Sequence, residues 1–451
     1  MKQLFFVITV GMLLLSCEKQ LEEKPDKSLS TPQSLSSIQS MLDYYVYTGY
    51  DNGADEASAD NYFVRDATYN GWLTDAQRGV YSWGTVNIFL NTYQSEWGRP
   101  YGNIYYSNVA LQSLQDIPKT PDNVIEWNDI AGQALFKRGA SFFRIANLFA
   151  LPYDAATSDA TMGIPLRLTP DFNERSVRAS LTETYRQVIS DLQASVPLLK
   201  VFVMHPARPS KPAAYGLLSR IYLSMRNYTA AKLYADSALA IRSQLMNYNS
   251  IPVSASTAYT FSNSNPESIY MSLVSNGQIL ITTARIDTVL YASYHADDLR
   301  KTRFFRLRPD GYYSFRGSYA SSDGLYGGVA TDELYITRAE CLARAGEKDA
   351  ALNDLNTLLV TRYKTGTYVP ITATDAADAL AKILVERRKE LVYRFTRWMD
   401  IRRLNLEGAG ITPKRYINGQ FFELPPNSPK YARPIPGDVI ALSGMPQNPQ
   451  Q

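Results

Sequence analysis

The chain has 451 residues, enough to bury a large core without cross-links, and its formal net charge is only +3. So small a charge excludes reliance on a strong positive field, and we expect no nucleic-acid partner. Tyrosine is abundant, with 32 residues, whereas histidine is scarce, with 2. Tyrosine rings suit wet, contact-rich surfaces, although many of them would simply pack between helices.

The first predicted element is an export signal that ends in a lipid-modified cysteine. Lys2 precedes an apolar stretch over 4–15, and Cys17 follows shortly after it. A basic start and an apolar core of about 7–15 residues are typical of a secretory signal, and this core is too short for a transmembrane helix. Residues 14–17 (LLSC) resemble the bacterial lipobox, which implies a lipoprotein signal peptide over 1–16 and acyl chains such as palmitate on Cys17. The alternative is an ordinary signal followed by an incidental cysteine.

Residues 17–32 predict a flexible tether between this lipid and the folded body. They are polar, charged and Pro-containing, with too little apolar surface to fold alone. Once Cys17 is acylated, Cys341 has no partner, so we expect no internal disulfide. The remaining residues, 33–451, are expected to form one domain.

Helical periodicity dominates the middle and the C-terminal third of the chain. The apolar spacing predicts helices over 134–149, 212–225, 229–241, 331–344, 348–362 and 376–404. The less regular segments are 43–102, 248–330 and 411–451, and the last of them is expected to wrap on the surface. Long irregular segments in a compact protein are often binding loops. The expected fold class is therefore mainly α, with long irregular loops and little β.

Two of the predicted helical pairs share an internal spacing. Bulky, small, aromatic, small and small positions follow one another as in a tetratricopeptide unit. These positions are Tyr215, Ser219, Tyr222, Ala231 and Ala238 in the first pair and Tyr335, Ala339, Leu342, Ala351 and Leu358 in the second. Small residues on facing helices let the backbones approach, so we expect tetratricopeptide-like hairpins that form a scaffold. The alternative is two unrelated helical hairpins.

A series of segments in fixed order carries a family resemblance. The segments are the lipobox at Cys17, Trp97 with 101–114 (YGNIYYSNVALQSL), 138–149, 208–223 (RPSKPAAYGLLSRIYL), 332–346 (DELYITRAECLARAG), 386–404 (ERRKELVYRFTRWMDIRRL), 434–436 and 447–450. Their order resembles that of the SusD/RagB-like family, the outer-membrane nutrient-binding lipoproteins of Bacteroidetes.

The resemblance implies a mostly helical, single-domain fold on the cell surface. It also implies that an oligosaccharide is captured and passed to a TonB-dependent (SusC-like) outer-membrane porin. The chain is short for the family, so some ligand-binding insertions would be reduced. The ligand class therefore stays open, because some relatives handle peptides or glycoprotein glycans.

No catalytic motif is present in the sequence. It contains no H-E-x-x-H, no G-x-S-x-G, no phosphate-binding Gly loop and no paired-Cys spacing. Glu386 and Glu390 stand four apart among arginines, and we expect them to pair with the cations of their own helix. The chain is therefore expected not to be an enzyme and to need no cofactor.

An acidic stretch over 51–60 (DNGADEASAD) is a candidate calcium site. Asp51, Asp55 and Asp60 would supply carboxylates, but the stretch lacks the spacing and terminal Glu of an EF-hand. The favoured interpretation is a solvated acidic loop without a metal.

Aromatic residues of the segments 43–102 and 248–330 are the candidate ligand contacts. Aromatic faces stack on the apolar face of a sugar ring, and amide and guanidinium groups donate hydrogen bonds to its hydroxyls. The candidates are Tyr69, Asn70 and Trp72 in the first segment and Tyr291, Tyr294, Tyr312, Tyr313, Arg316, Tyr319 and Tyr326, with Asp323 beside them, in the second. For each tyrosine, the alternative is a ring packed under a loop. Trp83, Trp97 and Trp398 are assigned to the core.

Three functions fit these patterns. The first is glycan capture with a porin, the second is capture of peptides or another nutrient on the same scaffold, and the third is a tetratricopeptide-type adaptor for a partner protein. An adaptor would place its aromatic residues on helix faces, whereas nutrient capture would cluster them in the irregular segments. Tyr and Trp are dense in 43–102 and 291–326, which favours nutrient capture.

Overall fold

The computed structural model describes residues 32–48, 53–71, 74–85, 88–89, 96–274 and 281–450. The signal peptide, Cys17, the tether up to residue 31, Asp51 of the candidate calcium site and Trp72 lie outside these residues. The helices are α3 (Leu35–Thr48), α4 (Ala54–Ser58), α5 (Asp66–Asn70), α6 (Asp75–Tyr81), α7 (Gly98–Ser113), α8 (Val124–Phe149), α9 (Leu181–Ser195), α10 (Lys211–Ser224), α11 (Tyr228–Leu239), α12 (Thr288–Ala292), α13 (Arg300–Arg303), α14 (Thr331–Arg344), α15 (Lys348–Leu359), α16 (Ala376–Glu390), α17 (Arg397–Asn405) and α18 (Gly437–Ser443).

The strands are short and pair two by two, always antiparallel. The pairs are β1 (Tyr62–Phe63) with β6 (Arg285–Ile286), β2 (Met162–Pro165) with β3 (Arg178–Ser180), β4 (Ser268–Tyr270) with β10 (Val329–Ala330), β5 (Leu273–Val274) with β9 (Leu325–Tyr326), β7 (Phe305–Leu307) with β8 (Tyr313–Phe315), and β11 (Lys414–Ile417) with β12 (Gln420–Glu423). The fold is therefore mainly helical with little strand, as the periodicity predicts.

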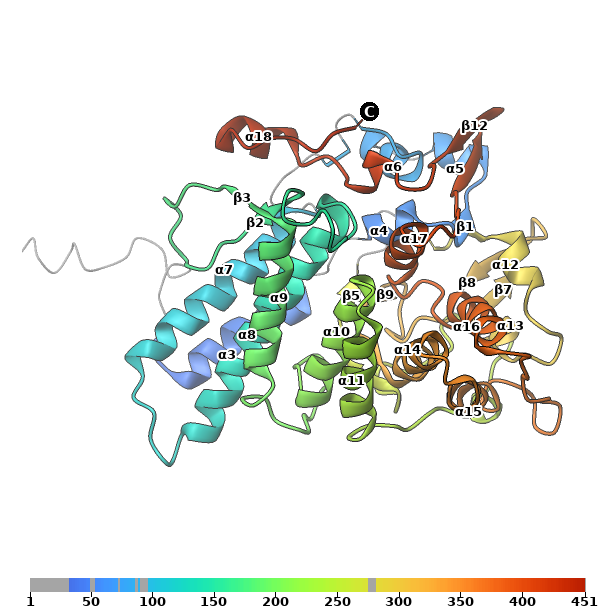
Figure 1. Cartoon of the computed structure of the whole chain (residues 1–451), viewed down its shortest axis with the longest axis horizontal. Coiled ribbons are helices and arrows are strands. Elements are labelled where there is room, and N and C mark those ends of the chain that lie inside the picture. Colours follow the sequence, from blue (N-terminus) through green and yellow to red (C-terminus); the bar gives the residue numbers. More distant parts are fainter. Residues whose placement is uncertain are drawn as a thin grey trace, which may run out of the picture.

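The long helices stand side by side across the molecule (Figure 1). Helices α3, α7, α8 and α9 form one side, α10 and α11 the middle, and α14 to α16 the other side, where the short strands β7 and β8 mark the far edge. Helices α5, α6 and α18 and strand β12 lie along the top in this view. Among the described residues, none of the helices has the length and hydrophobicity that crossing a bilayer requires.

Local sequence explains where several helices begin and how closely they pack. Ser180 and Glu183 form a reciprocal capping box that starts α9, and the side chain of Asn227 caps α11. Gly139 lets α8 lie against α9, because an added Cβ there would stand 3.1 Å from the carbonyl oxygen of Val188. Helix α8 begins ten residues earlier than the predicted range 134–149, since the less apolar turns before it also continue the helix.

The two tetratricopeptide-like hairpins are present as predicted. In the first, the Ser219 hydroxyl donates to the carbonyl oxygen of Ala231 at 2.8 Å, and the Tyr222 and Tyr234 rings stack with centroids 5.5 Å apart. The small residues expected at the helix contacts are fully buried; they are Ser219, Ala231, Ala238, Ala339 and Ala351. Their size lets the helices of each pair approach closely.

The turns of the two hairpins are also alike. The amide of Asn227 donates to the carbonyl oxygen of Tyr222, and the amide of Glu347 donates in the same way to Leu342, both at 2.9 Å. The residue before each amide is left-handed: Arg226 has φ +62° and Gly346 has φ +85°. Equivalent bonds and dihedrals in both turns support a repeat and argue against unrelated hairpins.

The predicted helix over 376–404 is wrong, because the chain breaks between α16 and α17. Tyr393 and Phe395 have φ values of +57° and +60°, a backbone region that bulky residues rarely adopt. Both side chains are buried, and the amide of Phe395 donates to the Glu56 carboxylate at 3.1 Å. Tertiary packing and this buried acceptor override the helical pattern.

The acidic stretch is not the solvated loop that its composition suggests. Residues 54–58 form α4 and are all buried, with Glu56 fully inaccessible. Burial raises the pKa of Glu56 to about 8. The Asp60 carboxylate accepts two hydrogen bonds from Arg397, at 2.6 and 2.8 Å, and is thereby compensated.

Buried ion pairs join the segment 386–403 to the rest of the chain, and one further pair, Arg387–Asp400, lies within the segment. The joining pairs are Arg300–Glu386, Arg300–Glu390, Arg362–Glu390, Arg403–Glu340, Arg394–Asp332 and Arg397–Asp60, with N–O distances from 2.5 to 3.0 Å. Ion pairing of Glu386 and Glu390 is confirmed, but their arginine partners come from outside their own helix. Lys389 alone supplies Glu386 with a cation from α16 itself.

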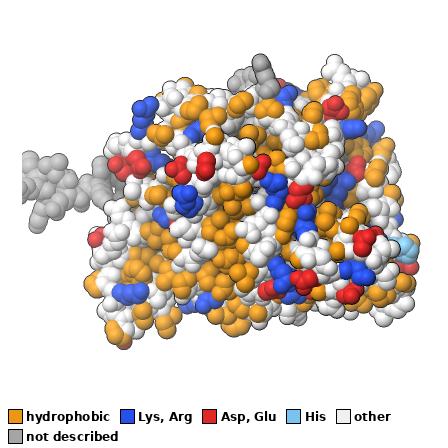
Figure 2. Space-filling model, in the orientation of Figure 1, with side chains coloured by type: hydrophobic (Ala, Val, Ile, Leu, Met, Phe, Trp, Pro, Cys, Tyr) orange, Lys and Arg blue, Asp and Glu red, His pale blue; other side chains and the backbone are white. Residues whose placement is uncertain are grey.

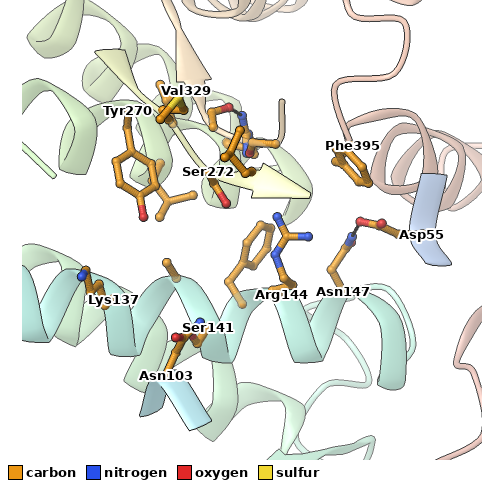
Figure 3. Close-up of a pocket in the computed structure, with 18 of the residues that line it drawn as sticks. Asp55, Asn103, Lys137, Ser141, Arg144, Asn147, Tyr270, Ser272, Val329 and Phe395 are labelled. Atoms are coloured by element: carbon orange, nitrogen blue, oxygen red, sulfur yellow. Dashed lines mark hydrogen bonds between the residues drawn. The ribbon is translucent and has the colours of Figure 1, made fainter. Parts of the chain in front are cut away.

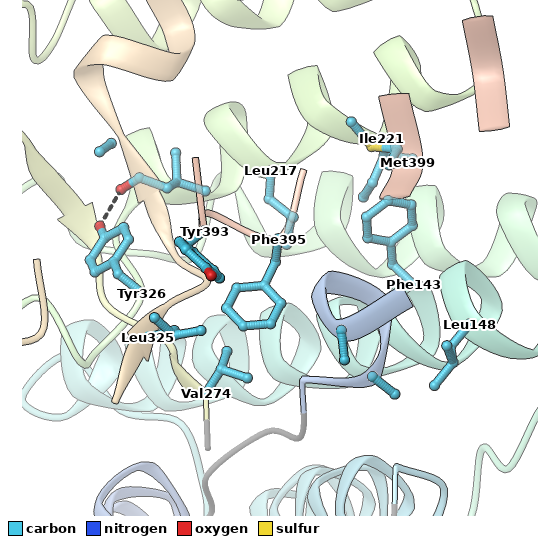
Figure 4. Close-up of a cluster of buried hydrophobic side chains, with 14 of the residues drawn as sticks. Phe143, Leu148, Leu217, Ile221, Val274, Leu325, Tyr326, Tyr393, Phe395 and Met399 are labelled. Carbon is cyan, nitrogen blue, oxygen red and sulfur yellow. Dashed lines mark hydrogen bonds between the residues drawn. The ribbon is translucent and has the colours of Figure 1, made fainter. Parts of the chain in front are cut away.

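The main core lies between the helices and the strand-rich segment. Val274, Leu325 and Phe395 pack toward Leu217 and Phe143 of the long helices (Figure 4). Trp83, Trp97 and Trp398 are 2%, 6% and 0% exposed, as their assignment to the core predicts.

The C-terminal tail enters the core as well. Arg433 and Ile435 are buried, and the Asn448 amide donates to the carbonyl oxygens of Phe149 and Arg433. The expectation that 411–451 only wraps on the surface is therefore incomplete, because its polar groups find partners inside.

The left-handed turn at Gly346 gives a stability prediction. No atom lies within 4 Å of an added Cβ, so Gly346→Ala should cost only backbone strain, about 1–2 kcal/mol of unfolding free energy. Gly437→Ala is the matched control, since its surroundings are equally open and its φ is not left-handed. Urea unfolding should show a lower unfolding free energy for Gly346→Ala and no change for Gly437→Ala. Equal decreases in the two variants would contradict backbone strain at Gly346 as the cause.

Candidate functional site

A surface beside the β7–β8 hairpin brings several candidate residues together. In the register of this hairpin Arg306 is opposite Ser314, and the amide of Arg308 donates to the carbonyl oxygen of Tyr312. Opposed residues and their alternate neighbours share one side of a pleated pair. We term this side the hairpin face; it comprises Arg306, Arg308, Tyr312, Ser314, Arg316 and the adjacent Phe63.

The sequence explains both sides of this hairpin. Phe305, Tyr313 and Phe315 alternate with the residues of the hairpin face and pack inward against α12 and the core. The turn between the strands reads Pro-Asp-Gly, and its Gly311 has φ +82°. This alternation holds the hairpin in register and leaves Arg306 and Arg308 half-exposed on the opposite side, where Arg316 is buried.

An aromatic pair forms the exposed part of the hairpin face. Tyr312 is 39% exposed, and its ring meets that of Phe63 edge to face with centroids 5.2 Å apart. Phe63 lies opposite Arg285 in the β1–β6 pair, and β6 contacts β8. The first irregular segment and the second therefore meet here, as the clustering of their aromatic residues suggests.

Tyr291 and Tyr313 stack on the other side of the hairpin. Their centroids are 3.8 Å apart at 18°, and the Lys301 ammonium lies 4.9 Å from the Tyr291 centroid. Both rings are half-buried. Burial and the hydrogen bond with Tyr313 raise the pKa of the Tyr291 hydroxyl above its ordinary value. The stack covers one face of each ring.

Tyr69 and Asn70 lie near the end of the β11–β12 hairpin. Tyr69 packs on the core and contacts Tyr81 with centroids 6.1 Å apart. The exposed Asn70 exchanges two amide hydrogen bonds with Asn418, at 3.0 and 2.9 Å. Trp72, two residues further on, lies outside the described residues.

Four of the candidates are inside the protein and meet protein partners. Tyr294, Tyr319 and Tyr326 are at most 2% exposed, and their hydroxyls donate to Lys389, Glu267 and Tyr270 respectively. Arg316 is 6% exposed and donates to the carbonyl oxygens of Ser254, Thr257 and Thr302. These three tyrosines are therefore not exposed for ligand contact. The alternative, a ring packed under a loop, is correct for them. Asp323 is exposed.

A groove that the sequence did not indicate lies between α7 and residues 165–176. It holds about 260 Å³, and Tyr105 and Phe172 stack beside it with centroids 4.8 Å apart. Phe172 is 73% exposed. The only sequence signal for this groove was a Phe within a polar stretch. That signal is weak, because single apolar residues are common on protein surfaces.

A cavity with both polar and apolar side chains lies between α8 and the strands β4, β5 and β10 (Figure 3). Lys137, Ser141, Arg144 and Asn147 reach it from α8, and Asn147 donates to Asp55 at 3.5 Å. Its volume is about 100 Å³, well below the roughly 300–1,000 Å³ of typical ligand pockets. It has room for a few water molecules rather than for a sugar.

A broader, open hollow of about 800 Å³ lies where the turns of the two tetratricopeptide-like hairpins meet. Tyr228 lines it and is held by Arg344, whose guanidinium carbon is 4.0 Å from the ring centroid. In the part of the chain that the structure describes, no three His, Cys, Asp or Glu side chains are grouped to hold a metal ion. Cys341 is a buried free thiol.

Comparison with known proteins agrees with this fold. A family described as "Starch-binding associating with outer membrane" matches residues 19–223, and the SusD family matches residues 332–450. SusD-like protein P2 of Formosa agariphila is 25% identical, over 78% of this chain and 79% of that protein.

Solved structures share the architecture. A SusD superfamily protein from Bacteroides thetaiotaomicron superposes with a TM-score of 0.75 at 20% identity, over 92% of this chain and 100% of that one. A SusD-like carbohydrate binding protein from Bacteroides vulgatus gives a TM-score of 0.70 at 20% identity, over 91% and 97% of the two chains. This chain belongs to the SusD/RagB-like family. Neither family match includes residues 224–331, which carry the β7–β8 hairpin.

Lys137 gives a pH-dependent prediction. Burial lowers the pKa of its ammonium from 10.5 to about 7, although Asp43 nearby opposes the change. Between these values the unfolded chain binds more protons, so the contribution of Lys137 to stability rises with pH. Lys137→Met should therefore have its largest stability advantage over wild type at pH 7 and below, and the advantage should shrink toward pH 10. Melting temperatures of the variant and of wild type from pH 6 to 10 measure this difference in stability, and the surface variant Lys382→Met is the control. A difference that stays constant over this pH range would contradict the lowered pKa of Lys137.

Proposed function

We propose that the protein is a non-catalytic glycan-binding lipoprotein of the outer membrane, which captures an oligosaccharide at the hairpin face. The observation that carries this proposal is the Phe63–Tyr312 pair, an exposed aromatic surface flanked by guanidinium groups in a SusD-family chain. Rings of this kind present apolar faces to sugar C–H groups, and arginines donate to hydroxyls and acidic substituents.

The relatives support a carbohydrate ligand. One family match carries starch binding in its description, and the Bacteroides vulgatus relative is a carbohydrate binding protein. The hairpin face belongs to the segment that neither family match covers, and loops on a rigid scaffold are where specificity usually resides. Tyr291 and Tyr313 would add ring edges, and Asn70 and Trp72 would extend the surface.

We propose that Cys17 carries the lipid anchor and that residues 17–32 tether the domain 33–451 to the membrane on its outer side. A flexible tether lets the folded body move over a TonB-dependent (SusC-like) porin, which would take the captured glycan. A broad apolar surface over α9 and α10 is available for contact with another protein, whereas charges of both signs are dense over the half that holds α14 to α16 (Figure 2).

The alternatives predict different binding. A peptide ligand would need extended backbone partners, and an adaptor would use the helical surface near the stacked Tyr222 and Tyr234 rings. Variants at the hairpin face would leave an adaptor's affinity for its partner unchanged. The same variants therefore separate an adaptor from nutrient capture, and the choice between glycan and peptide depends on which of the two the protein binds.

Tyr312→Ala should weaken glycan binding about tenfold or more, because stacking on one ring is worth roughly 1–3 kcal/mol by analogy with nucleobases. The ring is partly exposed, so the melting temperature should change little. Trp72→Ala is expected to behave in the same way. Isothermal calorimetry with oligosaccharides chosen from a glycan-array screen measures both variants.

Phe172→Ala is the matched control, since it removes an exposed stacked ring from the groove beside α7. Its affinity should equal that of wild type. If Phe172→Ala abolishes binding and Tyr312→Ala does not, the glycan site lies in the groove and the hairpin face is not the platform.

Cys17→Ala should release the protein from the outer-membrane fraction, because the variant lacks the residue to which we assign the lipid anchor. Proteinase treatment of intact cells should digest the wild-type protein if it faces outward. Retention of the variant in the membrane would contradict the anchor, and full protection of the wild type would contradict the outward orientation.

A further inference from the structure

Positive charge accumulates on the hairpin face without ion-pair partners among the described residues, although Asp310 stands in the turn of the hairpin. Arg306, Arg308 and the buried Arg316 share this side of the hairpin, and Arg303 ends α13, with Phe304 between it and β7. Within the described residues, no carboxylate pairs with any of these four guanidinium groups, although nearly every other buried arginine near α16 and α17 has one. Residues 275–280, between β5 and β6, contain no Asp or Glu.

Polar atoms on this face also lack hydrogen-bond partners. The Nε atoms of Arg303, Arg306, Arg308 and Arg316 are shielded from solvent and have no acceptor. Ser314, opposite Arg306, is 1% exposed, and its hydroxyl has no partner either. Buried polar groups in native proteins are nearly always paired, so these four atoms of the hairpin, together with Arg303 beside it, favour an anionic or hydroxylated ligand at this face.

The like charges affect one another. The pKa of Arg308 lies below its ordinary value because its guanidinium is partly desolvated and because Arg306 and Arg285 add positive charge. Desolvation together with Arg306 and Arg303 lowers the pKa of Arg316 in the same way. Such repulsion is unfavourable in the free protein and would be relieved by a bound anion.

The nearest carboxylate is already engaged. Asp310, in the turn of the hairpin, pairs with Arg285 at 3.0 Å and with Arg65 at 3.4 Å, and both of these arginines lie on the β1–β6 side. It therefore compensates a second pair of cations and leaves the arginines of the hairpin face with net positive charge.

We propose that the hairpin face binds the sulfate or carboxylate groups of an acidic glycan, so that the captured nutrient is an anionic oligosaccharide. This inference rests on the proposed glycan-binding function and names its substrate class. A guanidinium group holds a carboxylate or sulfate through two parallel hydrogen bonds, while Tyr312 and Phe63 offer rings to the sugar that bears the acid. A neutral glucan would use the rings and leave the guanidinium charges uncompensated.

The test compares three probes on the purified full-length protein in detergent: ι-carrageenan oligosaccharides for sulfate, oligogalacturonides for carboxylate, and maltoheptaose with laminarin oligosaccharides as neutral glycans. Calorimetry should give at least tenfold tighter binding for one or both acidic probes, and that affinity should fall as salt is raised. The acidic probe that binds identifies the anion.

Arg306→Ala and Arg308→Ala should each reduce the affinity for the acidic probe tenfold or more. Their melting temperatures should stay unchanged or rise, because each variant removes a repulsive charge. Arg306→Lys should retain part of the affinity, since it keeps the charge without the two-pronged donor. Arg186→Ala, which removes an exposed arginine from α9, is the matched control and should bind as wild type does.

The outcomes separate this inference from the function on which it rests. Tight neutral-glycan binding that Tyr312→Ala weakens and Arg306→Ala does not would overturn the acidic ligand and leave glycan capture standing. Binding of acidic probes that ignores both arginine variants would also overturn the hairpin face as the anion site. Failure of every probe class to bind would overturn both proposals.

Discussion

The fold depends on arginine–carboxylate pairs that the segment 386–403 buries against four other parts of the chain. Arg394 and Arg403 reach Asp332 and Glu340 of α14, while Glu390 meets Arg300 and Arg362. Removing one member of such a pair leaves an uncompensated buried charge, which typically costs about 3–5 kcal/mol, although an apolar replacement of the whole pair can be neutral. The pairs therefore specify which surfaces meet more than they add net stability.

The helical scaffold was predictable from sequence because its information is local. Apolar spacing, capping residues such as Ser180 and Asn227, and small residues at fixed intervals all act within a few turns. The break before α17 was not predictable, because its cause is distant: Phe395 donates to Glu56, more than 300 positions away in the chain. The burial of the acidic stretch has the same origin, since Arg397 compensates Asp60 only in the folded protein.

The candidate site was predictable only in outline. Tyrosine density pointed to two segments that meet in the structure, where Tyr312 is exposed beside Phe63. Density could not separate Tyr312 from Tyr319 and Tyr326, because burial of the last two depends on distant partners: their hydroxyls donate to Glu267 and Tyr270. The arginines of the hairpin face could be identified only from the structure. The sequence shows that they are charged, but it does not show that they lack ion-pair partners.

The pairing of β4 with β10 brings the two ends of the strand-rich segment together. Ser268 and Ala330 are partners although 61 residues separate them along the chain, and α11 and α14 contact each other on either side of this junction. A segment whose ends meet can change in length or sequence at small entropic cost to the helices that hold it. If the hairpin face is the ligand site, as we propose, exchange of residues 268–330 between relatives that keep Arg300 would be a direct way to transfer ligand preference on a constant scaffold.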